Sequence, residues 1–182
     1  MSYACIVADP PWNERGGGKI KRGADRHYPL LTTPEIIKTI LRCPFWLPAE
    51  SSHLWLWVTN NHLLDGLHVM KALGYTYLTN MCWIKPSFGL GRYLRGQHEL
   101  CLMGRRGRPM APLETAKLVP SIVQAPKREH SQKPDEAFAS IRRVSPGPRV
   151  ELFARVPRSG WDVWGMHAET GEYFHVKEQQ DG

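Results

Sequence analysis

The chain has 182 residues, of which 42% are hydrophobic and 23% charged, as is ordinary for a soluble globular protein. Twenty-four Lys and Arg residues against 17 Asp and Glu residues give a net charge of +7. A basic excess of this size favours an acidic partner, with nucleic acid first, although a basic protein without a polyanion partner has the same composition.

Cysteine usage and hydropathy exclude several classes of protein. The four cysteines are widely separated and form no C-x-x-C pair, so neither a zinc site nor a disulfide framework is predicted. The apolar opening is too short for a signal peptide, and no apolar run approaches the ~20 residues needed to span a bilayer. We therefore expect a cytoplasmic protein with free thiols, no metal and no membrane association.

Strand-like and helical patterns alternate along the chain. Strands are predicted at Tyr3–Ala8, His53–Thr59, Tyr75–Ile84, Glu99–Met103, Ser121–Gln124 and Arg149–Ala154. Helices are predicted from an N-cap at Thr33 to Cys43, from Asn60 to Leu73, and within Ser131–Gly147. This alternation favours an α/β fold with a largely parallel sheet. One domain is expected over residues 1–166, followed by a polar tail over residues 167–182.

Three basic stretches stand outside this alternation. The Gly-rich stretch 13–27 carries Lys19, Lys21, Arg22 and Arg26, the stretch 86–96 carries Arg92 and Arg95, and Arg105 and Arg106 close a predicted strand. Long loops in a compact domain are usually functional or disordered. We expect these cations to follow a phosphate backbone; a solvated basic surface is the alternative.

The stretch "ADPPW", residues 8–12, ends the first predicted strand. Ligands of open α/β sheets collect at the carboxyl ends of the strands, where Asp9 lies. Pro10 and Pro11 cannot donate backbone hydrogen bonds, but their carbonyls remain acceptors in nearly fixed directions. Trp12 offers a flat aromatic face beside them. A carboxylate, a rigid carbonyl and an indole together suit a planar molecule that bears an amino group, although a polar turn after a strand is the plainer interpretation.

The exocyclic amine of adenine fits this turn. Its lone pair is delocalised into the ring, so the amine is a poor nucleophile. If Asp9 and the Pro10 carbonyl each accept one amine hydrogen, the nitrogen becomes more nearly tetrahedral and its lone pair is freed. Such chemistry needs positioned acceptors and an in-line electrophile rather than a strong base, and the target base must leave its stack.

The turn and three later blocks resemble the DPPW-type adenine-N6 methyltransferases, the family of the 70-kDa subunit of the eukaryotic mRNA adenosine methyltransferase, with phage and bacterial members. The later blocks, in family order, are WIKPSFGLGRYLRGQHELCLMGRRG (83–107), REHSQKPDEAFASIRRVSPG (128–147) and VELFARVPRSGWDVWG (150–165). The resemblance implies a Rossmann-like fold that uses S-adenosylmethionine, with the catalytic motif N-terminal to the cofactor-binding strand.

The resemblance also implies roles for individual residues. Asp9 would contact both the target amine and the amino group of the cofactor. The other cofactor residues implied are His98, Ser131, Lys133, Phe153, Arg155 and Arg158. Tyr28 lies on a loop where relatives carry a tyrosine, and Lys85 would lie near phosphate. From the residues alone, Phe153 is equally a core residue, His98 a solvated strand start, Ser131 a helix cap and Lys85 a strand-end cation.

The sequence departs from the family pattern at two places. Only eight residues precede Asp9, without the acidic segment that eukaryotic relatives carry upstream. Met166 and His167 follow the last block where many bacterial relatives have Asn-Glu, and His167 substitutes only in part for their contacts to ribose. We therefore expect weak cofactor affinity or a pocket completed by a partner subunit in a homo- or heterodimer.

Three functions remain open. An adenine-N6 methyltransferase acting on DNA is the first, with RNA as a possible substrate. A non-catalytic nucleic-acid-binding subunit is the second, favoured by Met166 and His167 but disfavoured by the intact DPPW turn. Methylation of a small-molecule or protein amine is the third, and the basic loops disfavour it.

Overall fold

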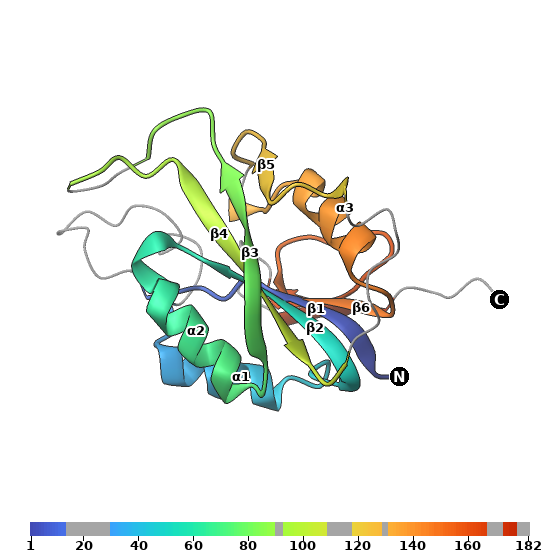
Figure 1. Cartoon of the computed structure of the whole chain (residues 1–182). Helices are drawn as coiled ribbons and strands as arrows, with labels where there is room; N and C mark the ends of the chain where they lie inside the picture. Colours follow the sequence, from blue (N-terminus) through green and yellow to red (C-terminus); the bar gives the residue numbers. More distant parts are fainter. Residues whose placement is uncertain (14–29, 90–92, 109–117, 129–130, 167–172, 178–182) are drawn as a thin grey trace.

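The computed structural model describes residues 1–13, 30–89, 93–108, 118–128, 131–166 and 173–177. Eight strands form one sheet in the order β5-β3-β4-β2-β1-β6-β7-β8. Figure 1 labels the strands β1 to β6 of this sheet. The strands are β1 (Tyr3–Ala8), β2 (Pro48–Val58), β3 (Thr76–Ile84), β4 (His98–Arg106), β5 (Ile122–Gln124), β6 (Arg149–Ala154), β7 (Asp162–Met166) and β8 (Tyr173–Val176). All six predicted strands are therefore present, and β7 and β8 were not predicted.

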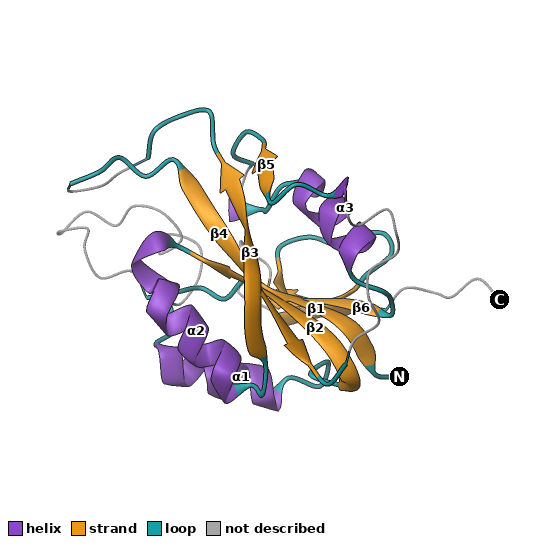
Figure 2. Cartoon of the chain, viewed as in Figure 1, coloured by secondary structure: helices purple, strands orange, loops and turns teal. Residues whose placement is uncertain are grey.

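Helices cover both faces of this sheet (Figure 2). They are α1 (Thr33–Arg42), the short 3-10 helix η2 (Asn60–His62), α2 (Leu63–Ala72) and α3 (Asp135–Val144). One core joins α1 and α2 to alternate residues of β1 and β2, among them Ile6 and Leu54. A second core joins α3 to the opposite face, through Val7 and Trp55. The period-2 alternation of these strands gives each core one face of the sheet.

The sheet is mostly parallel, as predicted, but mixed, because β4 and β8 run antiparallel to the other six strands. The β1–β2, β1–β6, β6–β7 and β3–β5 pairs are parallel, whereas β2–β4, β3–β4 and β7–β8 are antiparallel. The carboxyl ends of β1, β2, β3, β6 and β7 consequently meet the amino ends of β4 and β8 at one edge. We call this edge the carboxyl edge, and the other end of the sheet the amino edge.

Two helix starts differ from the predicted ones. The N-cap of α1 is Thr32 rather than Thr33: its backbone N–H donates to Glu35 at 2.8 Å, and its hydroxyl also contacts Glu35. Ser131 does not begin a helix, because its φ of 58° is left-handed, and α3 starts at Asp135. The sheet also continues through β8 into the segment 167–182 that was expected to be a polar tail.

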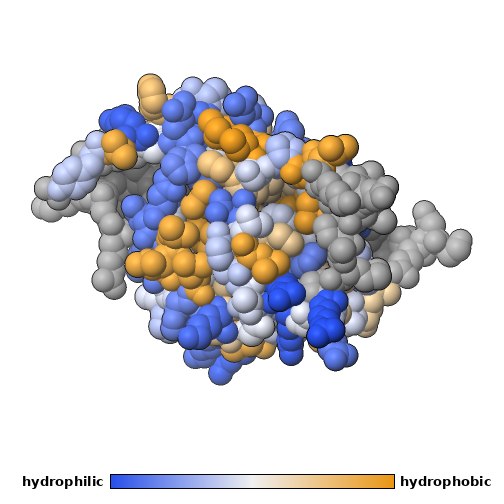
Figure 3. Space-filling view, viewed as in Figure 1, coloured by the Kyte–Doolittle hydropathy of each residue, from blue (hydrophilic) through white to orange (hydrophobic). Residues whose placement is uncertain are grey.

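The described surface mixes polar and apolar side chains. On the face seen in Figure 3 the apolar groups lie in scattered patches among polar ones. Among the described residues, Leu64 on α2 and Leu78 on β3 are exposed apolar side chains, with 81% and 46% of their surface exposed. No helix among the described residues is both long and apolar enough to cross a membrane.

Candidate active site

Asp9 follows β1 at the carboxyl edge, and the strand determines which way it faces. Cys5 and Val7 belong to the α3-side core, so the alternation of β1 directs Asp9 to the same side. Only 7% of Asp9 is exposed, which is unusual for a carboxylate unless it is paired.

Lys133, just before α3, is the partner of Asp9. Its Nζ lies 2.8 Å from each carboxylate oxygen of Asp9 and 3.3 Å from a carboxylate oxygen of Glu99 at the start of β4. Lys85, after β3, pairs with Glu99 in turn. These four residues form a continuous chain of alternating charge along the carboxyl edge, which we call the charge chain.

In the charge chain, the oppositely charged partners shift the pKa values of Lys133 and Glu99 more than burial shifts them in the other direction. Burial works to lower the pKa of Lys133, but the Asp9 and Glu99 carboxylates raise it above its usual value. Burial likewise works to raise the pKa of Glu99, but Lys133 and Lys85 bring it below its usual value. Every member of the chain therefore depends on a neighbour of opposite charge.

A second charged group lies on the same side of the sheet, around Arg158. Its Nε lies 3.3 Å from Glu151 on β6, and its guanidinium contacts Asp135 and covers the Phe138 ring of α3 at 3.5 Å. Burial raises the pKa of Glu151 to about 7, against the opposing effect of Arg158. Sequence reasoning missed Glu151; its only signal is an acid inside an apolar strand.

The pKa of Glu151 predicts how stability changes with pH. Because its pKa is higher in the folded chain than in the unfolded chain, the unfolded chain loses this proton first, and the free energy of unfolding falls between about pH 4.5 and 7. Glutamine does not titrate, so the free energy of unfolding of Glu151→Gln should not show this fall. Relative to wild type, it should therefore rise by on the order of 2 kcal/mol between pH 5 and pH 8. Urea unfolding at both pH values measures this; the exposed Glu50→Gln is the control, and a difference independent of pH contradicts the assignment.

Trp12 is anchored in the core, not presented as an open face. Its indole Nε1–H donates to the Trp57 carbonyl at 2.9 Å, its ring stacks on His62 at 5.3 Å, and 5% of the residue is exposed. The sequence-based expectation of an accessible stacking plane is therefore not met in this structure. The physical reason is the bridge between Trp12 and Leu31, which holds the turn against α1 and α2.

The two proline carbonyls point in directions set by backbone hydrogen bonds. The Pro10 carbonyl accepts from the Trp12 N–H at 2.9 Å, and the Pro11 carbonyl accepts from the Leu31 N–H at 2.8 Å. A carbonyl oxygen has two lone pairs, so each can accept one further hydrogen. The turn is thus rigid and retains acceptor capacity.

A narrow hollow lies on the other side of the turn. It is lined by Pro11, Leu31, Phe153, Arg155, Trp164, Gly165 and Tyr173. Phe153 reaches it because a β-bulge between Leu152 and Ala154 gives Phe153 a φ of 61°. Simple alternation would put Phe153 on the α3 side with Glu151; the extra residue turns it toward the α1–α2 side. Phe153 and Arg155, both implied by the resemblance, therefore share one hollow with the DPPW turn.

The other expected site residues are dispersed. His98, Arg95 and Ser131 are exposed, whereas Lys85 is held by Glu99. Arg105 and Arg106 pair with Thr76 and Ser52 at the amino edge, because β4 runs antiparallel to β2, so the structure does not bring them to the DPPW turn. The remaining expected residues, Lys19, Lys21, Arg22, Arg26, Tyr28, Arg92 and His167, lie outside the described residues.

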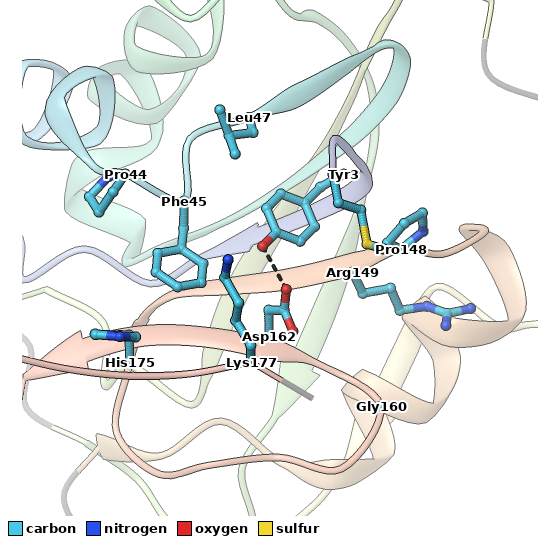
Figure 4. Close-up of a pocket in the computed structure, with 11 residues that line it drawn as sticks. Tyr3, Pro44, Phe45, Leu47, Pro148, Arg149, Gly160, Asp162, His175 and Lys177 are labelled. Carbon is cyan, nitrogen blue, oxygen red and sulfur yellow. Dashed lines mark hydrogen bonds between the residues drawn. The ribbon is translucent and has the colours of Figure 1, made fainter. Parts of the chain in front are cut away.

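The amino edge has a larger cavity of about 590 Å³ (Figure 4). Tyr3, Phe45 and Lys177 are among its lining residues, and the Tyr3 hydroxyl donates to Asp162 at 2.6 Å. None of the sequence-predicted site residues lines it. The cavity is at the opposite end of β1 from Asp9, so its size does not make it the centre of the chemistry.

A buried carboxylate at the carboxyl end of a central strand, beside an aromatic hollow, lies where open α/β sheets bind their ligands. Residues 3–167 match the MT-A70 family model, and the chain belongs to this family. It is an enzyme of that family and uses S-adenosylmethionine as the methyl donor.

The relatives come from bacteria and eukaryotes. The chain is 29% identical to the "Type II methyltransferase M.MunI" of a Mycoplasma species, over 90% of this chain and 77% of that protein. It is 30% identical to the human "N(6)-adenosine-methyltransferase catalytic subunit METTL3", over 84% of this chain and 26% of that protein. A putative MT-A70-like N(6)-adenosine-methyltransferase of Medicago truncatula is 29% identical, with 25% of its length covered. The chain thus spans most of the first relative and about a quarter of the others.

Proposed function

We propose that this protein methylates the N6 amine of adenine in nucleic acid, by direct in-line transfer to a base flipped out of its stack. The observation that carries the proposal is the position of Asp9, which is 7% exposed at the carboxyl edge and lies two residues from Pro11, a wall of the aromatic hollow. The similarity to the human N(6)-adenosine-methyltransferase catalytic subunit METTL3 supports the choice of amine.

The residues of the turn act as acceptors in this proposal. The Asp9 carboxylate accepts one hydrogen of the target amine, and the second lone pair of the Pro10 carbonyl accepts the other. Hydrogen bonds from both amine hydrogens to these fixed acceptors would favour the nitrogen lone pair for attack on the methyl carbon. As the N–C bond forms, the S–C bond of the cofactor would break with S-adenosylhomocysteine as the leaving group, and the methylated nitrogen would then lose one proton to solvent. Trp12 acts as the anchor that holds the turn, through its hydrogen bond to the Trp57 carbonyl and its stack on His62.

Lys133 holds Asp9 ready for this role. Its ammonium, 2.8 Å from Asp9, keeps the carboxylate in one orientation and occupies acceptor positions that an amine would use. Glu99, 3.3 Å away, is an alternative partner for Lys133 when an amine engages Asp9. The charge chain can therefore release one acceptor without leaving the ammonium unpaired.

Two observations fit the cofactor to the carboxyl edge. The hollow has aromatic lining residues suited to a purine and is also lined by Arg155, and the group around Arg158 and Glu151 lies on the other side of the DPPW turn. S-adenosylmethionine supplies an electrophilic methyl group when bound. Phe153 and Arg155 would hold its adenosine half, and Asp9 would hold its amino group.

DNA is the proposed polymer, with RNA second. The chain aligns with 77% of the bacterial type II methyltransferase but with only 26% of human METTL3. The similarity therefore extends over most of the bacterial protein, which favours DNA. The loop between β3 and β4, which starts and ends at the carboxyl edge, presents the exposed Arg95. A cation there can follow the backbone of a polymer whose base enters the site.

Neutralising Arg95 tests this loop. We expect Arg95→Gln to weaken binding of DNA uniformly across sequences and to lower the slope of log affinity against log salt by about 1, because one phosphate contact is lost. Fluorescence anisotropy across a salt series measures both quantities. Arg42→Gln, an exposed arginine at the end of α1, is the control. Equal slopes for wild type and Arg95→Gln would remove this loop from the interface.

Transfer of labelled methyl from S-adenosylmethionine to unmethylated DNA and RNA pools, followed by nucleoside mass spectrometry, tests the function. We expect 6-methyladenine in DNA, with no signal from Asp9→Ala. A signal in RNA alone would mean that RNA, and not DNA, is the substrate. Tight, salt-sensitive binding without any methylated product would favour the non-catalytic subunit instead, and product on a small-molecule or protein amine would overturn the proposal.

A further inference from the structure

We propose that Tyr173, the first residue of β8, is a cofactor-binding residue that stacks with Trp164 against the adenine ring of S-adenosylmethionine. The inference rests on the proposed assignment of Phe153 and Arg155 to the cofactor and extends it to a strand that the sequence did not predict. The part of the ligand that Tyr173 would contact is the purine of the cofactor.

Three aromatic rings form the wall that carries the inference. Tyr173 and Trp164 are stacked, with ring centroids 5.1 Å apart and an interplanar angle of 18°. Trp164 in turn meets Phe153 edge-on at 5.6 Å and 71°. The rings come from the neighbouring strands β8, β7 and β6, so the sheet itself sets their spacing.

The exposure of Tyr173 distinguishes it from the other two rings. Phe153 is 7% exposed and Trp164 is half-buried, whereas Tyr173 is 65% exposed although it lines the hollow. A large aromatic side chain at the mouth of a hollow loses water-exposed surface when a flat ligand covers it, and this burial favours binding.

The backbone beneath the wall is built to bring these rings together. Gly165 passes so close to the bulge that a Cβ there would lie 1.9 Å from the Ala154 carbonyl oxygen. Only glycine permits this approach, and the approach accompanies the left-handed Phe153. A strand pair of ordinary geometry would turn Phe153 to the opposite face. Left-handed aromatic residues are uncommon and gather at functional sites.

Stacking also compensates for the lack of a strong hydrogen-bonding side chain at position 166. Position 166 follows Gly165 in β7, and a methionine there has no hydrogen-bond donor and only a weak acceptor. Base–aromatic stacking needs neither, since every purine has a π-face. A pocket that relies on stacking can therefore hold the adenosine half without a polar contact at this position.

Calorimetric titration of S-adenosylhomocysteine into the full chain tests the inference without any polymer or methyl transfer. We expect Tyr173→Ala to weaken binding about tenfold, and Tyr173→Phe to stay within about twofold of wild type, because it keeps the ring. Tyr77→Ala, an exposed tyrosine on β3, is the matched control and should bind as wild type does. Thermal unfolding of each variant establishes that it is folded.

Two shorter probes locate the effect. Methylthioadenosine, which keeps the purine, should lose the same factor in Tyr173→Ala, whereas competition by L-methionine should be unchanged. Wild-type binding with unaltered affinity in Tyr173→Ala overturns the role of Tyr173 and leaves the proposed function standing. Absence of wild-type binding overturns the cofactor assignment and the role of Tyr173 with it.

Discussion

Asp9→Asn is expected to lower methyl transfer by about 10³-fold, the scale seen when one positioned hydrogen-bonding group is removed from a catalytic site. Asparagine has nearly the same shape but carries no charge, and its amide nitrogen is a donor where the target amine needs an acceptor. Single-turnover transfer of labelled methyl measures the chemical step. Affinity for S-adenosylhomocysteine should also fall, because Asp9 is proposed to hold the amino group of the cofactor.

The fold should survive this substitution. Lys133 keeps Glu99 at 3.3 Å, so its ammonium does not become an isolated buried charge. Circular dichroism should therefore match wild type, and the exposed Glu50→Gln should leave transfer unchanged. A folded Asp9→Asn protein with undiminished turnover would show that another group activates the amine.

Lys133→Met is expected to cost about 3 kcal/mol in the free energy of unfolding at pH 7 and to abolish transfer. Removing the ammonium leaves two acids, Asp9 and Glu99, facing the same buried space, and Asp9 loses its ion-pair partner. Breaking a buried ion pair in this way costs ~3–5 kcal/mol, because the remaining charge is uncompensated. Urea unfolding measures the loss.

A double-mutant cycle separates pairing from packing. Asp9→Asn combined with Lys133→Met removes both charges, so the loss should be smaller than the sum of the two single losses. We expect a coupling of at least 1 kcal/mol in this cycle, and Lys71→Met on α2 should show no coupling with Asp9→Asn. Strict additivity would mean that the 2.8 Å contact contributes nothing to stability.

Much of the fold was predictable because it follows from local patterns. The apolar run of β1 ends at an acid and two prolines, and the strand ends where predicted. The helix α1 follows a Thr-x-x-Glu capping pattern, although its cap lies one residue earlier than predicted. The strand β8 was missed, since its YFHV stretch lies in a polar tail and is a strand only because β7 pairs with it.

The site was predictable in composition but not in arrangement. Asp9, Lys133, Phe153 and Arg155 could be chosen from motifs, and the structure brings them to one edge. Glu99 and Glu151 were missed as site residues, because an acid at a strand start or in an apolar run is conspicuous only when its cationic partner is known. Arg105 and Arg106 fell at the opposite edge because strand direction is not a local property.

Three features of this protein were determined by the sequence by itself. They are a carboxylate next to two prolines, an excess of basic residues and the order of the family blocks. These depend on residue type and spacing along the chain, which a linear reading captures. The tertiary structure alone decided which charges neutralise one another, that Trp12 is an anchor, and that a bulge turns Phe153 into the hollow. Each of these depends on residues far apart in the sequence, so only the packing of the sheet could bring them together.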